Sequence, residues 1–320
     1  NEIYYYKQHR LELSRELLID QSAADGLLNN TNGFGTNALD WTIRYDLLTI
    51  GETIGTGSAG TVHKGKYLGE NVAIKRISQG NKWDRESFFE NFRRETSILS
   101  HLHHPNIVRF YGVSFLPSSS NSSDGGSFFI VTELCSHSLG HVLAANSYSR
   151  NEKLNIAIQI AHGIQALHSK KIIHRDLKPD NVLIDKNGNA KLADFGVAKQ
   201  SQMSKKNPRS SKVAATVAVG TPIYMAPELA LSTVAPTPKA DIFSYGIMLN
   251  AIFAGEEPYA AETSGMNPFM LMGRIGQGKR PDLAPDLDNE IVDLLQLCWS
   301  ENPNDRPSVA QVLKVLKRLV

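Results

Sequence analysis

The pattern of apolar and polar positions divides the chain into a strand-rich first part and a helix-rich second part. From Trp41 onward, short apolar runs alternate with turn residues, which is typical of successive strands in an antiparallel meander. We expect three such strands, at Leu47–Ile50, Thr61–Lys64 and Asn71–Ile74. The first part therefore predicts a small, mostly antiparallel sheet.

A helix is predicted next, from about Arg85 to Leu102, because its apolar residues share one side and its charged residues the other. Two further strands are expected on either side of a polar loop at 117–127. After Glu133 the pattern becomes helical, with helices expected at 154–169, 239–254, 291–300 and 308–319. Because the connection at 133–138 is short, we expect an α+β fold of two lobes that face each other across a cleft. One is a small antiparallel β lobe with one main helix, and the other is larger and mostly helical.

Residues 1–40 differ from the rest of the chain. Leucines between residues 11 and 18 permit a short amphipathic helix, but residues 20–40 are rich in Asn, Gly, Thr and Ser without an apolar period. We interpret residues 1–40 as an extension or linker, with a docking helix as the alternative. Because the chain starts with Asn1 and not Met, we expect a piece of a longer protein. The expected domain is 41–320, with a small lobe at about 41–134 and a large lobe at about 135–320.

Composition excludes several classes of protein. With 41% hydrophobic and 21% charged residues, the chain is not disordered as a whole. A net charge of +2 provides no global field for nucleic acid or an acidic membrane, so we expect no nucleic-acid partner. Two cysteines, Cys135 and Cys298, make neither a disulfide framework nor a zinc pattern, and no stretch approaches the length of a membrane span. We expect a cytoplasmic protein, or the cytoplasmic portion of a larger one.

The first candidate site is the glycine-rich string Gly55–Val62, which has the form G-x-G-x-x-G-x-V between two expected strands. Glycines allow the backbone to approach phosphates and to offer its amides to them. Alone, the string also fits an ordinary hairpin turn. A dinucleotide site would need a helix at the third glycine, and a strand is expected there instead.

The second candidate is Lys75, at the end of an apolar strand, where an isolated ammonium is costly to bury. It needs an anionic partner in the following helix. We predict Glu95 in preference to Glu86 and Glu90, because only Glu95 is correctly placed ahead of the next strand.

The strongest signal is the string His174–Asn181, which reads H-R-D-L-K-P-D-N. Within it, the carboxylate of Asp176, the ammonium of Lys178 and the amide of Asn181 suit a reaction that orients a hydroxyl, neutralises a phosphoryl group and binds a metal ion. Asp194 follows in an Asp-Phe-Gly string and is a plausible second magnesium ligand.

A third string, Gly220–Glu228, reads G-T-P-I-Y-M-A-P-E. Farther on, Asp241 heads an apolar helix and Arg306 follows Asn304 and Asp305. Glu228 and Arg306 are ordinary surface charges when taken singly. Taken with the other strings, they suggest a buried carboxylate paired with a distant guanidinium, which would help to fix the segment before Glu228.

The order of these strings resembles the signature set of the protein kinase family over about residues 47–319, with closest similarity to its tyrosine-kinase-like group. The resemblance implies that Asp176 orients the substrate hydroxyl, Lys178 stabilises the transferring phosphoryl, and Lys75 paired with Glu95 holds the phosphates of ATP. It implies that Asn181 and Asp194 hold Mg²⁺. The residues that it implies around the rest of ATP are Ile54, Gly55, Gly57, Gly60, Val62, Ala73, Thr132, Glu133, Cys135 and Leu183.

The function implied by this resemblance is transfer of the ATP γ-phosphate to serine and threonine hydroxyls of protein substrates, with Lys178 and Thr221 favouring these over tyrosine. Phosphorylation in the loop at 197–219, by an upstream kinase or through self-association, is expected to raise activity. A pseudokinase or scaffold that binds nucleotide and protein partners is the main alternative, and a small-molecule kinase the second. Two departures from the family pattern are Ala59 in the glycine-rich loop and Asn250, where relatives often carry Trp.

Overall fold

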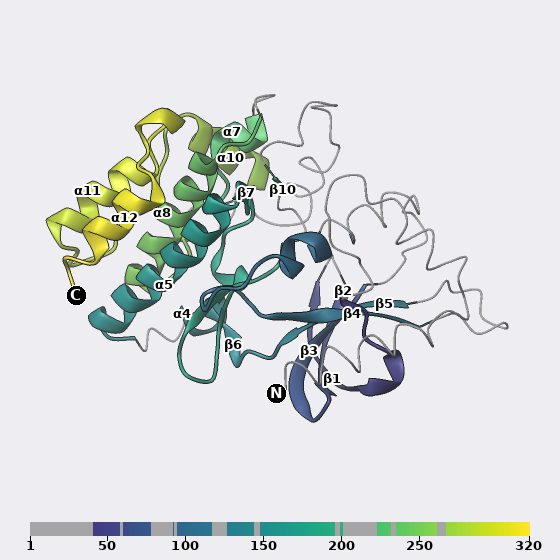
Figure 1. The fold of residues 1–320 in the computed structure, drawn as a ribbon. Coiled ribbons are helices and arrows are strands. Elements are labelled where there is room, and N and C mark those ends of the chain that lie inside the picture. The colour runs from purple at the N-terminus through teal and green to yellow at the C-terminus, as the bar shows by residue number, and fades with distance from the viewer. Residues whose placement is uncertain are drawn as a thin grey trace. The chain divides into compact units, whose positions relative to one another are not determined.

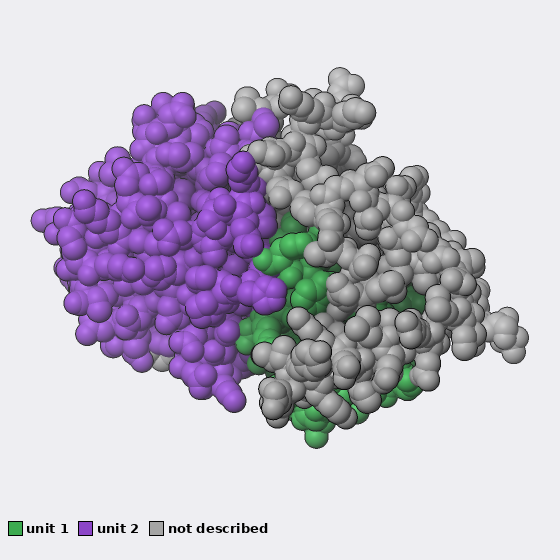
Figure 2. Space-filling view, viewed as in Figure 1, with its two compact units in different colours: residues 1–101, 109–134 green, residues 102–108, 135–320 purple. Residues whose placement is uncertain are grey.

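The computed structural model describes most of the chain beyond residue 40. The described residues are 41–57, 60–77, 92, 95–116, 127–143, 148–195, 199–200, 223–231, 235–260 and 267–320. The expected linker at 1–40, nearly all of the loop at 117–127 and nearly all of the loop at 197–219 lie outside them. The chain forms two compact units: residues 1–101 with 109–134, and residues 102–108 with 135–320 (Figure 2).

Unit 1 is built on an antiparallel sheet of five strands in the order β1-β2-β3-β5-β4 (Figure 1). This confirms the predicted meander, since the first three strands follow one another in space as in sequence. Residues 95–100, at the end of the expected helix, are helical. The strands are β1 (Leu48–Gly57), β2 (Gly60–Tyr67), β3 (Glu70–Ile77), β4 (Phe110–Leu116) and β5 (Ser127–Glu133).

The alternation of side chains along β3 determines which of its residues face the core of unit 1. Val72 and Ile74 are completely buried, in a cluster that also contains Phe129 and Val131 of β5. Successive side chains of a strand point to opposite faces, so Ala73 and Lys75 lie on the other face of the sheet. The segment before β1 contributes Ile43 to the core cluster, and its N–H donates to Val113 O at 2.7 Å on β4.

Unit 2 is mainly helical, as predicted. The longest helix among its described residues, α5, starts four residues earlier than expected because the Ser149 side chain accepts from the Glu152 N–H while Glu152 accepts in return from the Ser149 N–H. Helix α8 is buried along most of its length and ends at Gly255, whose φ of 73° is the left-handed conformation that favours glycine. The helices are α4 (Leu139–Leu143), α5 (Arg150–Ser169), α7 (Pro227–Leu231), α8 (Pro238–Ala254), α10 (Pro268–Gly276), α11 (Asn289–Cys298) and α12 (Val309–Leu316).

Short strands and turns in unit 2 were not predicted from the sequence. They comprise β6 (His137–Ser138), β7 (Ile172–Ile173), β8 (Val182–Ile184), β9 (Ala190–Leu192), β10 (Lys199–Gln200) and the 3-10 turns η3 (Pro179–Asn181) and η4 (Pro303–Asp305). Strands of two or three residues are too short to show a periodic pattern. The small sheet β6-β8-β9 nevertheless matters for the site, because β8 directly follows Asn181 and β9 comes shortly before Asp194.

Asn250 has a clear role within α8. It is 2% exposed, its Nδ2 donates to Asp282 O at 2.8 Å, and its Oδ1 accepts from Ala284 N at 2.9 Å. The amide therefore satisfies two main-chain groups of the segment before α11, which an indole could not do in the same way.

No helix in the described part of the chain is both long and apolar enough to cross a membrane.

Candidate active site

In unit 1, Lys75 forms the ion pair that the sequence predicted. Its Nζ lies 3.0 Å from Glu95 Oε1, and the two side chains are only 17% and 9% exposed. A buried ammonium requires such a partner, because leaving either charge unpaired away from water costs several kcal/mol. The pairing with Glu95 is confirmed, whereas Glu86 and Glu90 lie outside the described residues.

The described residues of the glycine-rich string lie at the end of β1 and at the start of β2. Gly55 pairs with Val62 and Gly57 with Gly60, and Val62 pairs in turn with Lys75 on β3. Gly60 has a φ of 131°, and a Cβ there would lie 2.2 Å from Arg76 O, so only glycine fits. A Cβ at Gly55 or Gly57 would meet nothing within 4 Å. Packing therefore does not require glycine at these two positions, which agrees with a close approach of a ligand to their backbone.

The remaining nucleotide candidates divide between the units. Ala73 pairs with Thr132 across β3 and β5, which places both on the strands of unit 1 beside Lys75. The Glu133 N–H is already engaged, donating to Arg109 O at 2.9 Å. In unit 2, Ser136 N donates to Ile184 O at 2.8 Å, which holds the segment after Cys135 against the strand that contains Leu183. Ile54 lies in β1 and is 48% exposed.

In unit 2, the polar residues of the string His174–Asn181 converge on one carboxylate. Asn181 Nδ2 donates to Asp176 Oδ2 at 2.9 Å and to Asp176 O at 2.7 Å, and Lys178 Nζ lies 3.2 Å from Asp176 Oδ2. The 3-10 turn η3 brings Asn181 back toward Asp176. The Asp176 side chain stays 24% exposed, so one carboxylate is fixed in orientation and still accessible.

Asp194 is held next to this group by main-chain bonds. Ala193 N donates to Asn181 O at 2.9 Å, and the His174 Nε2–H donates to Ala193 O at 3.1 Å. Asp194 itself has a φ of 57°, in the left-handed region that is strained for most residues. The structure thus places Asp176, Lys178, Asn181 and Asp194 in one part of unit 2.

The buried residue Asp241 at the start of α8 fixes the backbone of this string. Its Oδ2 accepts from His174 N at 2.9 Å and from His168 Nε2 at 2.8 Å, and its Oδ1 accepts from Arg175 N at 2.9 Å. Arg175 is thereby kept at a φ of 72°. In the sequence, Asp241 stands out only as an acid at the head of an apolar helix. That unexpected charge was the available signal, but its partners lie more than 60 residues away.

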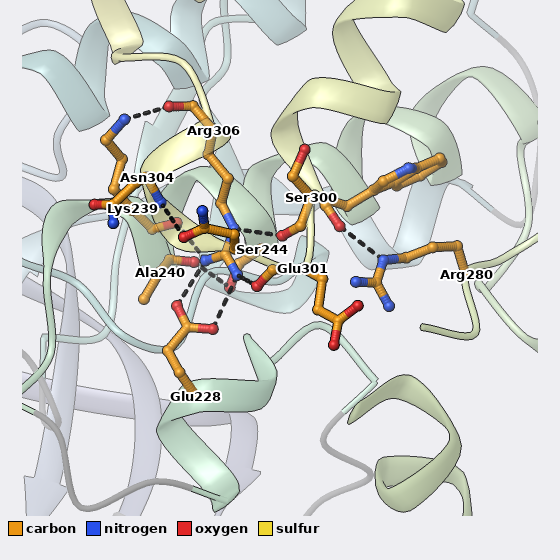
Figure 3. A network of polar contacts seen from close by, with 11 residues as sticks. Glu228, Lys239, Ala240, Ser244, Arg280, Ser300, Glu301, Asn304 and Arg306 are labelled. Atoms are coloured by element: carbon orange, nitrogen blue, oxygen red, sulfur yellow. Dashed lines mark hydrogen bonds and ion pairs between the residues drawn. The ribbon is translucent and has the colours of Figure 1, made fainter. Parts of the chain in front are cut away.

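The predicted pairing of Glu228 with Arg306 is also confirmed, but the buried member is the guanidinium, whereas the carboxylate is 22% exposed (Figure 3). Arg306 Nη1 and Nη2 donate to the two carboxylate oxygens of Glu228 at 2.6 and 2.9 Å. The Arg306 side chain has no exposed surface, and its Nε donates to Ser300 O at 2.9 Å. Lys239 closes the network, because its O accepts from Arg306 Nη1 and its Nζ donates to Arg306 O.

This network holds the start of α7 in place. Arg306 and Arg280 both lie over the ring of Phe243 in α8, with centroid distances of 4.9 and 5.0 Å. Arg280 Nε in turn donates to Trp299 O at 2.8 Å (Figure 3). Glu228 is therefore anchored to the buried helix α8 through a rigid guanidinium.

A sequence profile described as the protein kinase domain matches residues 48–316. Among similar proteins, the probable serine/threonine-protein kinase SIS8 of Arabidopsis thaliana is 36% identical over 286 residues, which cover 88% of this chain and 26% of that protein. The serine/threonine-protein kinase CTR1 of the same plant is 33% identical, covering 89% of this chain and 33% of that protein. The RGS domain-containing serine/threonine-protein kinase A of Dictyostelium discoideum is 31% identical over 98% of this chain and 25% of its own length.

The chain spans about a fifth to a third of the length of these and other similar proteins. The matched residues nevertheless belong to both units and include every motif described above. Only the residues before 48 and after 316 lie outside the match. The proteins that it resembles are named serine/threonine-protein kinases, and the chain itself belongs to the protein kinase family.

Proposed function

We propose that this chain transfers the γ-phosphate of ATP to serine and threonine hydroxyls of protein substrates. The observation that carries the proposal is the geometry around Asp176, whose carboxylate is oriented by Asn181 and Lys178 and stays partly exposed. A carboxylate in that state can accept or orient a hydroxyl proton. Lys178, beside it, supplies a positive charge for the transferring phosphoryl group.

The nucleotide would be held mainly by unit 1. Lys75, kept in place by Glu95, offers an ammonium to phosphate oxygens, and the open backbone at Gly55 and Gly57 leaves room for them. Within unit 1, adenine would lie against Ile54, Val62 and Ala73, with Thr132 at the back and a main-chain group of Glu133 at its edge. Because the Glu133 N–H is engaged with Arg109, its carbonyl oxygen is the group that we assign to adenine.

The donor set also fits Mg²⁺. The Asn181 amide nitrogen is occupied by Asp176, which leaves its Oδ1 as the side-chain acceptor, and Asp194 adds a carboxylate. Both are hard oxygen ligands, and Mg²⁺ in such sites usually takes few protein ligands in addition to phosphate oxygens. Bound there, Mg²⁺ would neutralise phosphate charge.

Several features of the proposal extend beyond the described residues. We propose that phosphorylation in the loop at 197–219 raises activity, through an upstream kinase or self-association, and that residues 1–40 form a linker to other parts of a longer, cytoplasmic protein.

The names of the similar proteins support serine and threonine as acceptors. The pseudokinase alternative is disfavoured, because Lys75, Asp176, Asn181 and Asp194 are all present.

The test is Asp176→Asn, whose amide fits the same space but cannot accept the proton. We expect the rate of phosphoryl transfer from ATP to generic protein substrates to fall at least about a thousandfold. A loss of this size is within the range that a positioned general base and electrostatic stabilisation contribute to catalysis. A thermal shift with ATP and Mg²⁺ should persist, which separates lost catalysis from lost binding. Transfer by the purified variant at a tenth of the wild-type rate or more would contradict the assignment of Asp176.

A further inference from the structure

The carboxylate of Glu133 occupies a place that a main-chain carbonyl normally takes. Glu133 is the last residue of β5, and Arg109 directly precedes the neighbouring strand β4. The antiparallel pairing of Phe110 with Thr132 reaches as far as this point, so Arg109 and Glu133 lie opposite each other. In an antiparallel pair of this kind, the two residues can exchange two main-chain hydrogen bonds, each N–H donating to the opposite carbonyl.

One of these two bonds has its regular form and the other does not. The Glu133 N–H donates to Arg109 O at 2.9 Å, but the Arg109 N–H donates to Glu133 Oε1 at 2.6 Å. A main-chain N–H has a single hydrogen, so a donation of this length to the carboxylate is not made to the carbonyl oxygen of Glu133. The side chain of Glu133 therefore competes with its own carbonyl for one donor, and in this structure the side chain binds it.

The strand beside this pair is irregular. Phe110 pairs with Thr132 and Gly112 with Val131, so Tyr111 is an extra residue that forms a β-bulge in β4. The guanidinium of Arg109 lies over the Tyr111 ring, 5.1 Å from its centroid. Glu133 is thus bound by the main chain of Arg109, while the Arg109 side chain is directed to the ring.

We propose that the Glu133 side chain is a positioning residue for adenine: by accepting the Arg109 N–H, it leaves the Glu133 carbonyl oxygen to accept a hydrogen bond from the 6-amino group of the nucleotide. This inference rests on the proposed function, in which that carbonyl oxygen is assigned to adenine. Without the carboxylate, the Arg109 N–H would turn to the carbonyl and complete the regular pair. A carbonyl oxygen has two lone pairs, so the contact with the nucleotide would weaken rather than disappear.

The experiment compares ADP with purine riboside diphosphate, which lacks only the 6-amino group and, like ADP, is not turned over. Dissociation constants of both are measured with Mg²⁺ by isothermal titration calorimetry. We expect the wild-type protein to bind ADP about tenfold more tightly than the analogue, as for one hydrogen bond in a partly exposed site. Glu133→Ala should reduce this ratio to about threefold or less by weakening ADP alone. In kinase assays it should raise KM for ATP and leave kcat nearly unchanged.

Matched variants separate position from charge. Glu133→Gln keeps an acceptor oxygen without the charge and should retain most of the ratio. Glu133→Asp keeps the charge but is one methylene shorter, and it should lose the ratio as Glu133→Ala does. Arg109→Ala keeps the main-chain N–H and should behave as the wild type. Glu70→Gln is the control for a nearby carboxylate, because Glu70 accepts from the Tyr111 hydroxyl at 3.4 Å and not from a main-chain group.

Several results would overturn the inference. The first is an unchanged ratio in Glu133→Ala, whether both nucleotides weaken equally or neither does. The second is a loss in Arg109→Ala as large as in Glu133→Ala, which would indicate an ion pair, and the third is a ratio that survives in Glu133→Asp but not in Glu133→Gln, which would indicate charge. A wild-type protein that binds both nucleotides equally would refute the carbonyl contact and the inference together. If the wild-type protein discriminates between them but phosphorylates no protein, the proposed function fails separately, and the binding ratios still decide the role of Glu133.

Discussion

The buried guanidinium of Arg306 gives the sharpest prediction about stability. Arg306→Ala removes a bidentate bond to Glu228 and the donors to the main-chain oxygens of Ser300 and Lys239. Breaking a buried ion pair by removing one partner costs about 3–5 kcal/mol, and each buried carbonyl left without its donor adds about 1 kcal/mol or more. Allowing for the partial exposure of Glu228, 22%, we expect the free energy of unfolding to fall by about 5 kcal/mol.

Such a loss approaches the whole stability of many domains, so a milder variant is needed. Arg306→Lys keeps the charge but cannot form the fork to both carboxylate oxygens and the carbonyls, and we expect a loss of about 2–3 kcal/mol. Arg318→Ala is the control, because Arg318 is exposed and its guanidinium donates to Lys314 O within the same turn, and the change should cost less than about 0.5 kcal/mol.

The assay is urea unfolding followed by tryptophan fluorescence. Trp299, whose carbonyl accepts from Arg280 in the same network, reports on this part of unit 2. An Arg306→Lys variant as stable as the wild type, or an Arg306→Ala variant within about 1 kcal/mol of it, would show that water replaces the guanidinium and that the network is not a stabilising element.

Three further predictions concern other sites. Under mild alkylation, Cys135, which is partly exposed, should react before Cys298, because burial raises the pKa of the Cys298 thiol to about 12. Peptide mapping checks this order of labelling, and labelling of Cys298 before Cys135 would contradict the prediction. Burial alone would raise the pKa of Asp185, but hydrogen bonds from Asn189 and its neighbours lower it below its ordinary value of 3.8. Its contribution to stability is therefore present above about pH 4 and lost as the pH falls further, so the wild type should lose more stability than Asp185→Asn between about pH 5 and 3 in thermal melts. Finally, Asn250→Ala should cost about 2–4 kcal/mol in urea unfolding, since two main-chain groups lose their partners, and a loss under about 1 kcal/mol would contradict this account.

Much of the local structure follows from the sequence. The strands β1 to β3 were predicted because alternation and turn residues are properties of neighbouring positions, and α5 and α8 because their apolar spacing extends over several turns. The proximity of Asp176, Lys178 and Asn181 could also be predicted from the sequence, because a 3-10 turn of three residues is enough to bring them together. Because Lys75 lies at the end of an apolar strand, the sequence predicted an acidic partner for its ammonium. Glu95, in the following helix, is that partner.

Tertiary structure decided what depends on distant segments. Nothing near His174 in the chain indicates that Asp241 holds its backbone, and the short strands β8 and β9 are defined only by their pairing in the sheet β6-β8-β9. Residues 102–108 join unit 2 because Leu192 N donates to Asn106 O and Val108 N to Leu192 O, both at 2.9 Å. Local sequence pattern determines hydrogen bonds and burial within one helix or strand. A buried polar group, in contrast, meets a partner that is distant in the sequence only when the chain has folded, so the sequence separation of the two groups does not identify that partner.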